Sequence, residues 1–349
     1  NKAYEDLSRA IKKDPEYIHS LYLMGITLYN LQSYEEASSF LDKVSKRNSS
    51  YPGLVLYQGL IFEALGETEK ALEYYTAALA ATPEDEDIMM RAVAIYVAYG
   101  KLDDADILVN KVLEKNPTHG GAIFYLGRVY MGKNKYAEAL HHFLRALKIS
   151  PSVGLYYLWA GLASEKMGNF SDTLKFSEKA LEMDGNLSEA FLLRGKIRTR
   201  MGMIKDARRD LKKAMELKPG LMEAWGSLGV IFEEERNYTE AMRAYTRYLE
   251  HFPDDFEIHS RYGLILYDKG MLGEAKDHFS SAIVVAKEYS PFSKWRFTSL
   301  YYLGLIEEKT GNKSKAVNYY QEYIAEAPDD AIDLEVVQER LMVLKPPEE

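Results

Sequence analysis

The histidines are the residues best suited to metal binding or proton transfer, and their spacing argues against both. Only His141 and His142 are close together, and adjacent helical residues point about 100° apart, so they cannot share one ligand face. The 349 residues include no cysteine, which removes disulfides, thiolate metal sites and cysteine nucleophiles. The other histidines are scattered: His19, His119, His251, His259 and His278. We therefore predict no metal site.

Glycine, serine and the carboxylates give no catalytic pattern either. No GxGxxG or GxxxxGK[ST] loop occurs, and no serine has the context of a nucleophile elbow. Acidic residues are abundant, but their positions indicate no catalytic pair. We predict that the chain is not an enzyme and holds no cofactor.

Aromatic and basic side chains remain, and the chemistry they suit is binding. The chain has 27 tyrosines, and rings with a polar tip offer large, rigid contact areas. The net charge is −9, yet residues 188–221 hold ten basic and four acidic side chains, so the rest of the chain carries −15. This basic island suits an acidic protein segment better than nucleic acid, because the remaining surface would repel phosphate.

The elements that must position these residues recur every 34 residues. Glycine marks the period, with Val93 in one place and one glycine seven residues late: Gly25, Gly59, Gly127, Gly161, Gly195, Gly229, Gly263 and Gly304. An alanine usually follows twelve residues later, and a proline closes most units. Glycine inside a helix costs about 1 kcal/mol relative to alanine. We therefore expect two helices to cross closely there, with the alanine as the matching small surface.

Each period has the apolar spacing of two amphipathic helices joined by a turn. Its fullest copy lies in residues 222–255 and contains Trp225, Leu228, Gly229, Ala241, Tyr245 and Pro253. Over nearly the whole chain this pattern resembles the tetratricopeptide repeat. The resemblance implies an all-α, right-handed superhelical solenoid of antiparallel helix pairs (TPR-like). It also implies that first helices line a concave groove and second helices form the convex back.

The repeat count predicts five parts of the chain. They are 1–17, the second helix of a truncated repeat; 18–289, eight repeats; 290–296, an insertion; 297–330, a ninth repeat; and 331–349, a capping helix with a wet outer surface and a tail. Because the chain begins in mid-repeat, we expect a fragment of a longer protein. The insertion is expected to lengthen two helices or to add a projecting loop.

Two local patterns carry further expectations. Thr173, Ser177 and Gly185 replace the usual alanine, aromatic residue and proline, which indicates either tolerated drift or a hinge at 170–187. Asn-X-Ser/Thr recurs in the turns at 169, 237 and 312. There we expect a left-handed asparagine, followed by Ser171, Thr239 and Ser314 as helix N-caps.

We expect the chain to be a scaffold or adaptor that binds a peptide or helix of a partner protein in the groove. An acidic segment would suit the basic residues. The expected partner-binding residues are Tyr22, Tyr29, Tyr57, Phe124, Tyr125, Arg128, Trp159, Lys166, Lys196 and Arg200. The family's carboxylate clamp is not carried over, because its groove positions contain no asparagine here.

Alternative functions remain open. The repeats could build a homo-oligomeric scaffold, such as bacterial envelope or export machinery, or, less in keeping with the acidic surface, an RNA-binding array. No stretch of about 18 uninterrupted apolar residues occurs, so no membrane span is expected. The compartment is left open between the cytoplasm and, from the missing cysteines, a bacterial periplasm or envelope.

Overall fold

The computed structural model describes residues 2–328, 331 and 333–345, and these residues form helices, turns and no strand. The chain divides into two compact units, Asn1–Gly185 and Asn186–Glu349. The boundary falls within residues 170–187, where the repeat pattern is weakest. No helix in the described ranges is both long and apolar enough to cross a membrane.

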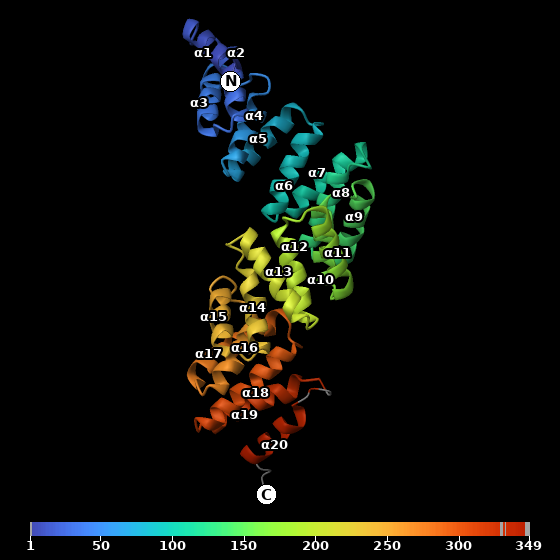
Figure 1. Cartoon of the computed structure of the whole chain (residues 1–349), viewed down its shortest axis with the longest axis vertical. Coiled ribbons are helices and arrows are strands. Elements are labelled where there is room, and N and C mark those ends of the chain that lie inside the picture. Colours follow the sequence, from blue (N-terminus) through green and yellow to red (C-terminus); the bar gives the residue numbers. More distant parts are fainter. Residues whose placement is uncertain (1, 329–330, 332, 346–349) are drawn as a thin grey trace. The chain divides into compact units, whose positions relative to one another are not determined.

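In the first unit, a single helix is followed by five antiparallel pairs (Figure 1). The helices are α1 (Lys2–Lys13), α2 (Ile18–Asn30), α3 (Tyr34–Arg47), α4 (Leu54–Ala64), α5 (Thr68–Ala81), α6 (Glu86–Ala98), α7 (Leu102–Lys115), α8 (Gly120–Gly132), α9 (Tyr136–Ile149), α10 (Gly154–Lys166) and α11 (Phe170–Met183). Even-numbered members are the first helices of the repeats. Helix α1 packs on α2 through Leu7 and Ile11.

In the second unit, four pairs precede a final helix. The helices are α12 (Ser188–Arg200), α13 (Ile204–Leu217), α14 (Glu223–Glu234), α15 (Tyr238–Leu249), α16 (Phe256–Asp268), α17 (Leu272–Tyr289), α18 (Lys294–Lys309), α19 (Lys313–Glu326) and α20 (Leu334–Leu344). Helices α17 and α18 have 18 and 16 residues where most second and first helices have 14 and 13. The seven extra residues of this period therefore lengthen both helices.

The close helix crossing exists, but its partner is not the predicted one. A Cβ atom on Gly127 would lie 2.6 Å from Phe143 of the paired helix, and one on Gly263 would lie 2.7 Å from Phe279. Glycine is therefore required by the large side chain that lies sixteen residues after it. The alanine twelve residues after the glycine contacts it through its backbone oxygen. Val93 is tolerated because the residue opposite it is the smaller Val109, and both are fully buried.

The prediction of the N-caps was wrong by two residues. Asn169 and Asn237 are themselves the caps, and their side-chain oxygens accept from the backbone N–H three residues later. Their φ values are ordinary; the left-handed residue is the preceding one, Gly168 or Arg236. Asn312 also occupies the N-cap position. The Asn312 side chain makes no capping hydrogen bond, so side-chain capping explains the asparagine only at Asn169 and Asn237.

A hydrogen bond followed by an ion pair, here called a polar relay, connects neighbouring helix pairs in three places where the second helix has a buried tyrosine. The hydroxyl of Tyr245 donates to Glu233 of its own repeat, and Glu233 binds Arg261 of the next first helix at 3.1 Å. The same relay recurs as Tyr75–Glu63–Arg91 and, with the last helix supplying the arginine, as Tyr320–Glu308–Arg340. Where the ring is a phenylalanine, as in Phe143, the glutamate is replaced by Met131. A buried hydroxyl requires an acceptor, and the glutamate supplies it in each of these three repeats.

The outer surface of the last helix, α20, is less polar than predicted for a capping helix. Val337 is buried against α19, as a capping stripe requires. On the other side, however, Met342 and Val343 are 60% and 80% exposed. The outer face of α20 is therefore partly apolar.

The crossing predicts opposite outcomes for two glycines of the second unit. Gly263→Ala should lower the free energy of unfolding by about 1–3 kcal/mol, because the methyl group meets the Phe279 ring. Gly273→Ala, on α17 with nothing within 4 Å, should be neutral or stabilising by up to about 1 kcal/mol. Urea denaturation of the two variants and the parent checks this, and equal effects would contradict it.

Candidate functional site

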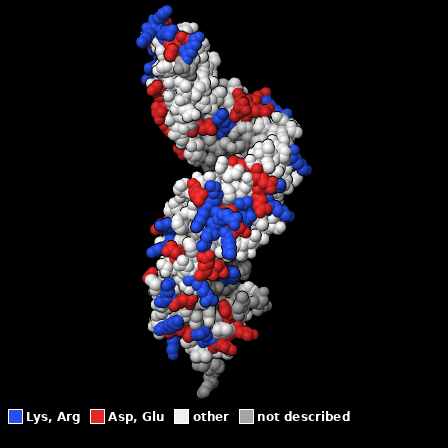
Figure 2. Space-filling view, in the orientation of Figure 1, with Lys and Arg blue, Asp and Glu red and all other residues white. Residues whose placement is uncertain are grey.

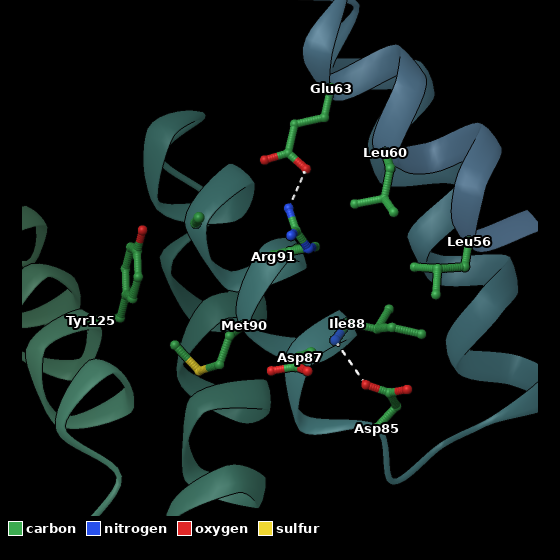
Figure 3. Close-up of a pocket in the computed structure, with 10 residues that line it drawn as sticks. Leu56, Leu60, Glu63, Asp85, Asp87, Ile88, Met90, Arg91 and Tyr125 are labelled. Carbon is green, nitrogen blue, oxygen red and sulfur yellow. Dashed lines mark hydrogen bonds and ion pairs between the residues drawn. The ribbon is translucent and has the colours of Figure 1, made fainter. Parts of the chain in front are cut away.

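A pocket of about 580 Å³ lies on the first-helix side of the first unit. It is open between α4 and α6, and Tyr125 of α8 stands at its far edge (Figure 3). Its lining residues are Leu56, Leu60, Glu63, Asp85, Asp87, Ile88, Met90, Arg91, Ala94 and Tyr125. Three successive first helices thus contribute to one pocket, and Tyr125 is the one predicted partner-binding residue in its lining.

The pocket combines apolar walls with an excess of negative charge. Asp85 is the N-cap of α6 and accepts from Ile88 N–H at 3.1 Å (Figure 3). Glu63 binds Arg91 at 2.9 Å and also accepts the Tyr75 hydroxyl. No residue in the described part of the chain pairs with the exposed carboxylate of Asp87. None of these residues stands out in the sequence, because only the stacking of repeats brings them together.

The predicted tyrosines of α2 and α4 form one aromatic cluster beside this groove. The ring of Tyr57 lies 5.9 Å from that of Tyr22 and 6.1 Å from that of Tyr29, both nearly edge-on. Tyr22 is only 9% exposed, and burial together with Tyr57 and Tyr51 raises its pKa to about 12. Tyr22 therefore joins two repeats, whereas Tyr29 and Tyr57 are only half-buried.

The residues predicted on α8 and α10 converge around one arginine. The Arg128 guanidinium lies 4.2 Å from the centre of the Trp159 ring and 5.9 Å from that of Tyr125. Its Nε is buried without a hydrogen-bond partner, and no described carboxylate pairs with it. Burial lowers the pKa of Arg128, because the charged form is desolvated. Phe124 is buried at 4% exposure and stacks on Tyr156, so it supports the cluster from below.

Of the other predicted basic residues, only Lys166 lies in the same compact unit as Arg128. Lys166 is exposed in the last turn of α10. Lys196 and Arg200 belong to α12 of the second unit. Lys196 and Arg200 each make an interaction within the described structure.

The basic island of the sequence divides into a buried and an exposed part. Arg194 and Arg198 both bind the buried carboxylate of Asp210, at 2.7 Å each. The exposed part lies on the second helix α13, where Lys205, Arg209, Lys212 and Lys213 face solvent; Figure 2 shows a blue patch over α12 and α13. These side chains lie on a second helix, and Arg209 and Lys213 also form ion pairs with Asp206 and Glu216 of the same helix.

Two histidines that are distant in sequence meet in the second unit. His259 Nδ1 lies 2.9 Å from His278 Nδ1, and His259 Nε2 lies 2.9 Å from the Pro253 carbonyl oxygen. Since a carbonyl only accepts, His259 Nε2 carries the proton and its Nδ1 accepts from His278. Burial and the neighbouring His259 lower the pKa of His278 to about 4. No group of three or more metal-binding side chains occurs among the described residues.

Family models for the tetratricopeptide repeat match residues 22–86, 63–118, 121–153, 192–250, 234–291 and 298–330. A TPR repeat-containing protein of Methanocaldococcus jannaschii is 29% identical over 120 residues, which is 34% of this chain and 21% of that protein. The peroxisomal targeting signal receptor of Candida glabrata is 29% identical over 149 residues, 42% of this chain and 25% of the receptor. The chain thus spans a quarter or less of the length of these relatives.

Solved structures with the same fold cover almost the whole chain. One chain in the structure of the APC/C hetero-tetramer Cut9–Hcn1 is similar over 97% of this chain and 81% of that chain, with a TM-score of 0.65 at 13% identity. An IFIT1 monomeric mutant with a capped oligonucleotide matches 99% and 88%, with a TM-score of 0.59 at 15% identity. At these identities the likeness establishes the fold alone.

The histidine pair predicts a loss of stability in acid. An unfolded histidine titrates near 6.5, so its folded-state value of about 4 means that protons favour the unfolded chain. The stability that is present above pH 6.5 should fall by about 1–3 kcal/mol as the pH drops to 4. His278→Gln should make this decrease smaller, although His142, also lowered to about 4, still contributes. Denaturation at several pH values tests this, and an unchanged decrease in the variant contradicts it.

Proposed function

The chain belongs to the tetratricopeptide repeat family, and from that premise we propose that its first unit binds a peptide segment of a partner protein. Proteins built from this repeat generally act as scaffolds for protein–protein interaction. The proposed binding surface is the groove formed by the first helices α4, α6, α8 and α10. It is a binding scaffold without catalytic activity.

The arrangement of Arg128 is the observation that carries this proposal. A desolvated guanidinium without a described counter-ion is costly, unless a carboxylate is supplied from outside. Trp159 and Tyr125 hold it in place, so a partner loses little side-chain entropy in using it. An acidic group of the peptide would bind Arg128, while Tyr29, Tyr57 and Tyr125 offer flat contact area. Lys166, which belongs to the same unit, adds positive charge that favours the approach of acidic segments.

One relative gives additional support. A peroxisomal targeting signal receptor is, by its name, a protein that recognises a signal, and part of its sequence resembles this chain. That similarity is in keeping with a role of this chain in binding another protein. The identity of the segment bound here does not follow from that similarity.

Binding can be tested without knowing the natural partner. A phage library of random 12-residue peptides is selected on the wild-type protein, and the dissociation constants of enriched peptides are measured by fluorescence anisotropy. Arg128→Ala and Trp159→Ala should each weaken binding about tenfold or more, because both residues form the centre of the surface. The matched control, Lys148→Ala on the exposed side of the second helix α9, should leave binding unchanged. Equal loss in all three, or no enriched peptide, would count against the proposal.

Self-assembly is a second candidate, favoured by the distribution of charge. Residues 63–106 hold eleven acidic and three basic side chains. A second pocket, of about 750 Å³, lies there among α5, the end of α6 and the start of α7. Its rim carries Glu69, Glu73 and Asp104. The exposed basic face of α13 is the complementary surface of a second copy.

A mixing experiment tests self-assembly. The wild type should associate in low salt and dissociate in high salt, as measured by light scattering. Glu73→Lys and Arg209→Glu should each remain monomeric, but an equimolar mixture should form a dimer, because each retains one intact half of the interface. A wild type that is monomeric in low salt at high concentration would exclude this candidate.

A further inference from the structure

We propose that the groove pocket between α4 and α6 receives a lysine or arginine side chain of the bound peptide. The bound segment then carries a basic residue as well as the acidic residue assigned to Arg128. This inference rests on the proposed function, since it specifies what the same groove selects. The groove would then select peptides that contain both a basic and an acidic residue, rather than acidic segments in general.

Charge in the pocket is the first argument. Three carboxylates, Glu63, Asp85 and Asp87, line it together with one cation, Arg91. That cation is already neutralised, because Glu63 binds it at 2.9 Å. Asp85 is engaged with the backbone of α6, although it keeps its full negative charge. The pocket therefore has two uncompensated negative charges, and Asp87 is the one whose carboxylate is unengaged among the described residues.

The walls of the pocket are the second argument. Leu56 and Leu60 of α4 lie on the same side of α6 as Ile88, while Met90 lies on the side of Tyr125 (Figure 3). Lysine and arginine have aliphatic stems that pack on apolar surface while the charged end stays near water or a counter-ion. A pocket with leucine walls and carboxylates at its rim matches both parts of such a side chain. A hydrated metal ion would make no use of the apolar walls.

Tyr125 connects this pocket to the carboxylate-binding arginine. The ring lines the pocket and lies beneath the Arg128 guanidinium at 5.9 Å. One extended peptide that crosses α6 and α8 therefore passes both charged sites. Its backbone would run over Tyr125 between them.

Repeat geometry gives the spacing of the two charges in the peptide. Ala94 occupies in α6 the repeat position that Arg128 occupies in α8, 34 residues later. Asp87 lies seven residues before Ala94, which is about 10 Å along the helix. Neighbouring helices are about 10 Å apart, so Asp87 and Arg128 are separated by roughly 14 Å. An extended chain covers that distance in about four residues.

The test uses the random 12-residue phage library on three proteins in parallel. On the wild type, enriched peptides should contain Lys or Arg about four residues from Asp or Glu, flanked by apolar residues. Asp87→Lys should lose the basic preference, at least tenfold in its enrichment, and keep the acidic one. Glu114→Lys makes the same charge change on an exposed position of the second helix α7 and should preserve both preferences. Circular dichroism melting of the three proteins confirms equal folding.

The possible results separate this inference from the proposed function. Enriched peptides that are acidic and apolar but show no basic preference overturn the inference and leave groove binding intact. A basic preference that survives Asp87→Lys also overturns it. A wild type that enriches no peptide rejects groove binding itself. If Asp87→Lys is less stable, Asp87→Asn, which removes only the charge, should reduce the basic preference in the same direction.

Discussion

The close crossing of two helices within each repeat is the constraint on which the rest of the structure depends. At that crossing a large side chain of the second helix, such as Phe143 or Phe279, fills the space that a Cβ of the first helix would need. The contact fixes the pairing of the helices, and so determines which faces of the first helices remain uncovered. The groove residues Leu60, Arg91 and Arg128 lie on those faces. The close packing within each helix pair therefore determines which side chains remain exposed for binding.

Periodicity in the sequence predicts the helix pairs well, because a repeated packing contact must repeat its residue types. It does not identify which side chain fills the crossing, since alanine at twelve and the aromatic residue at sixteen recur in the same phase. For a similar reason it assigned the N-caps to Ser171 and Thr239, two residues after the asparagines that cap. Both corrections concern contacts between atoms, which spacing alone cannot distinguish.

The candidate site could be predicted in part. Tyr125, Arg128 and Trp159 stand out in the sequence because they are large or charged residues on first helices, and the structure brings their side chains close together. Phe124 has the same type but is buried, because its neighbour in the helix faces the groove instead. Asp87 could not be found in this way, since one acidic residue among eleven in its segment carries no signal. The net charge of residues 188–221 likewise does not show that Asp210, which is buried, already pairs with two of their arginines.

The central claim is that a peptide binds the first helices of the first unit, and methyl NMR tests it most directly. A peptide enriched on the wild type is titrated into protein labelled at its leucine, isoleucine and methionine methyl groups. The account predicts shifts at Leu56, Leu60 and Met90, which line the pocket, with Leu108 and Leu144 on second helices unchanged. Shifts at Leu108 and Leu144 without any at Leu56, Leu60 and Met90 would contradict it.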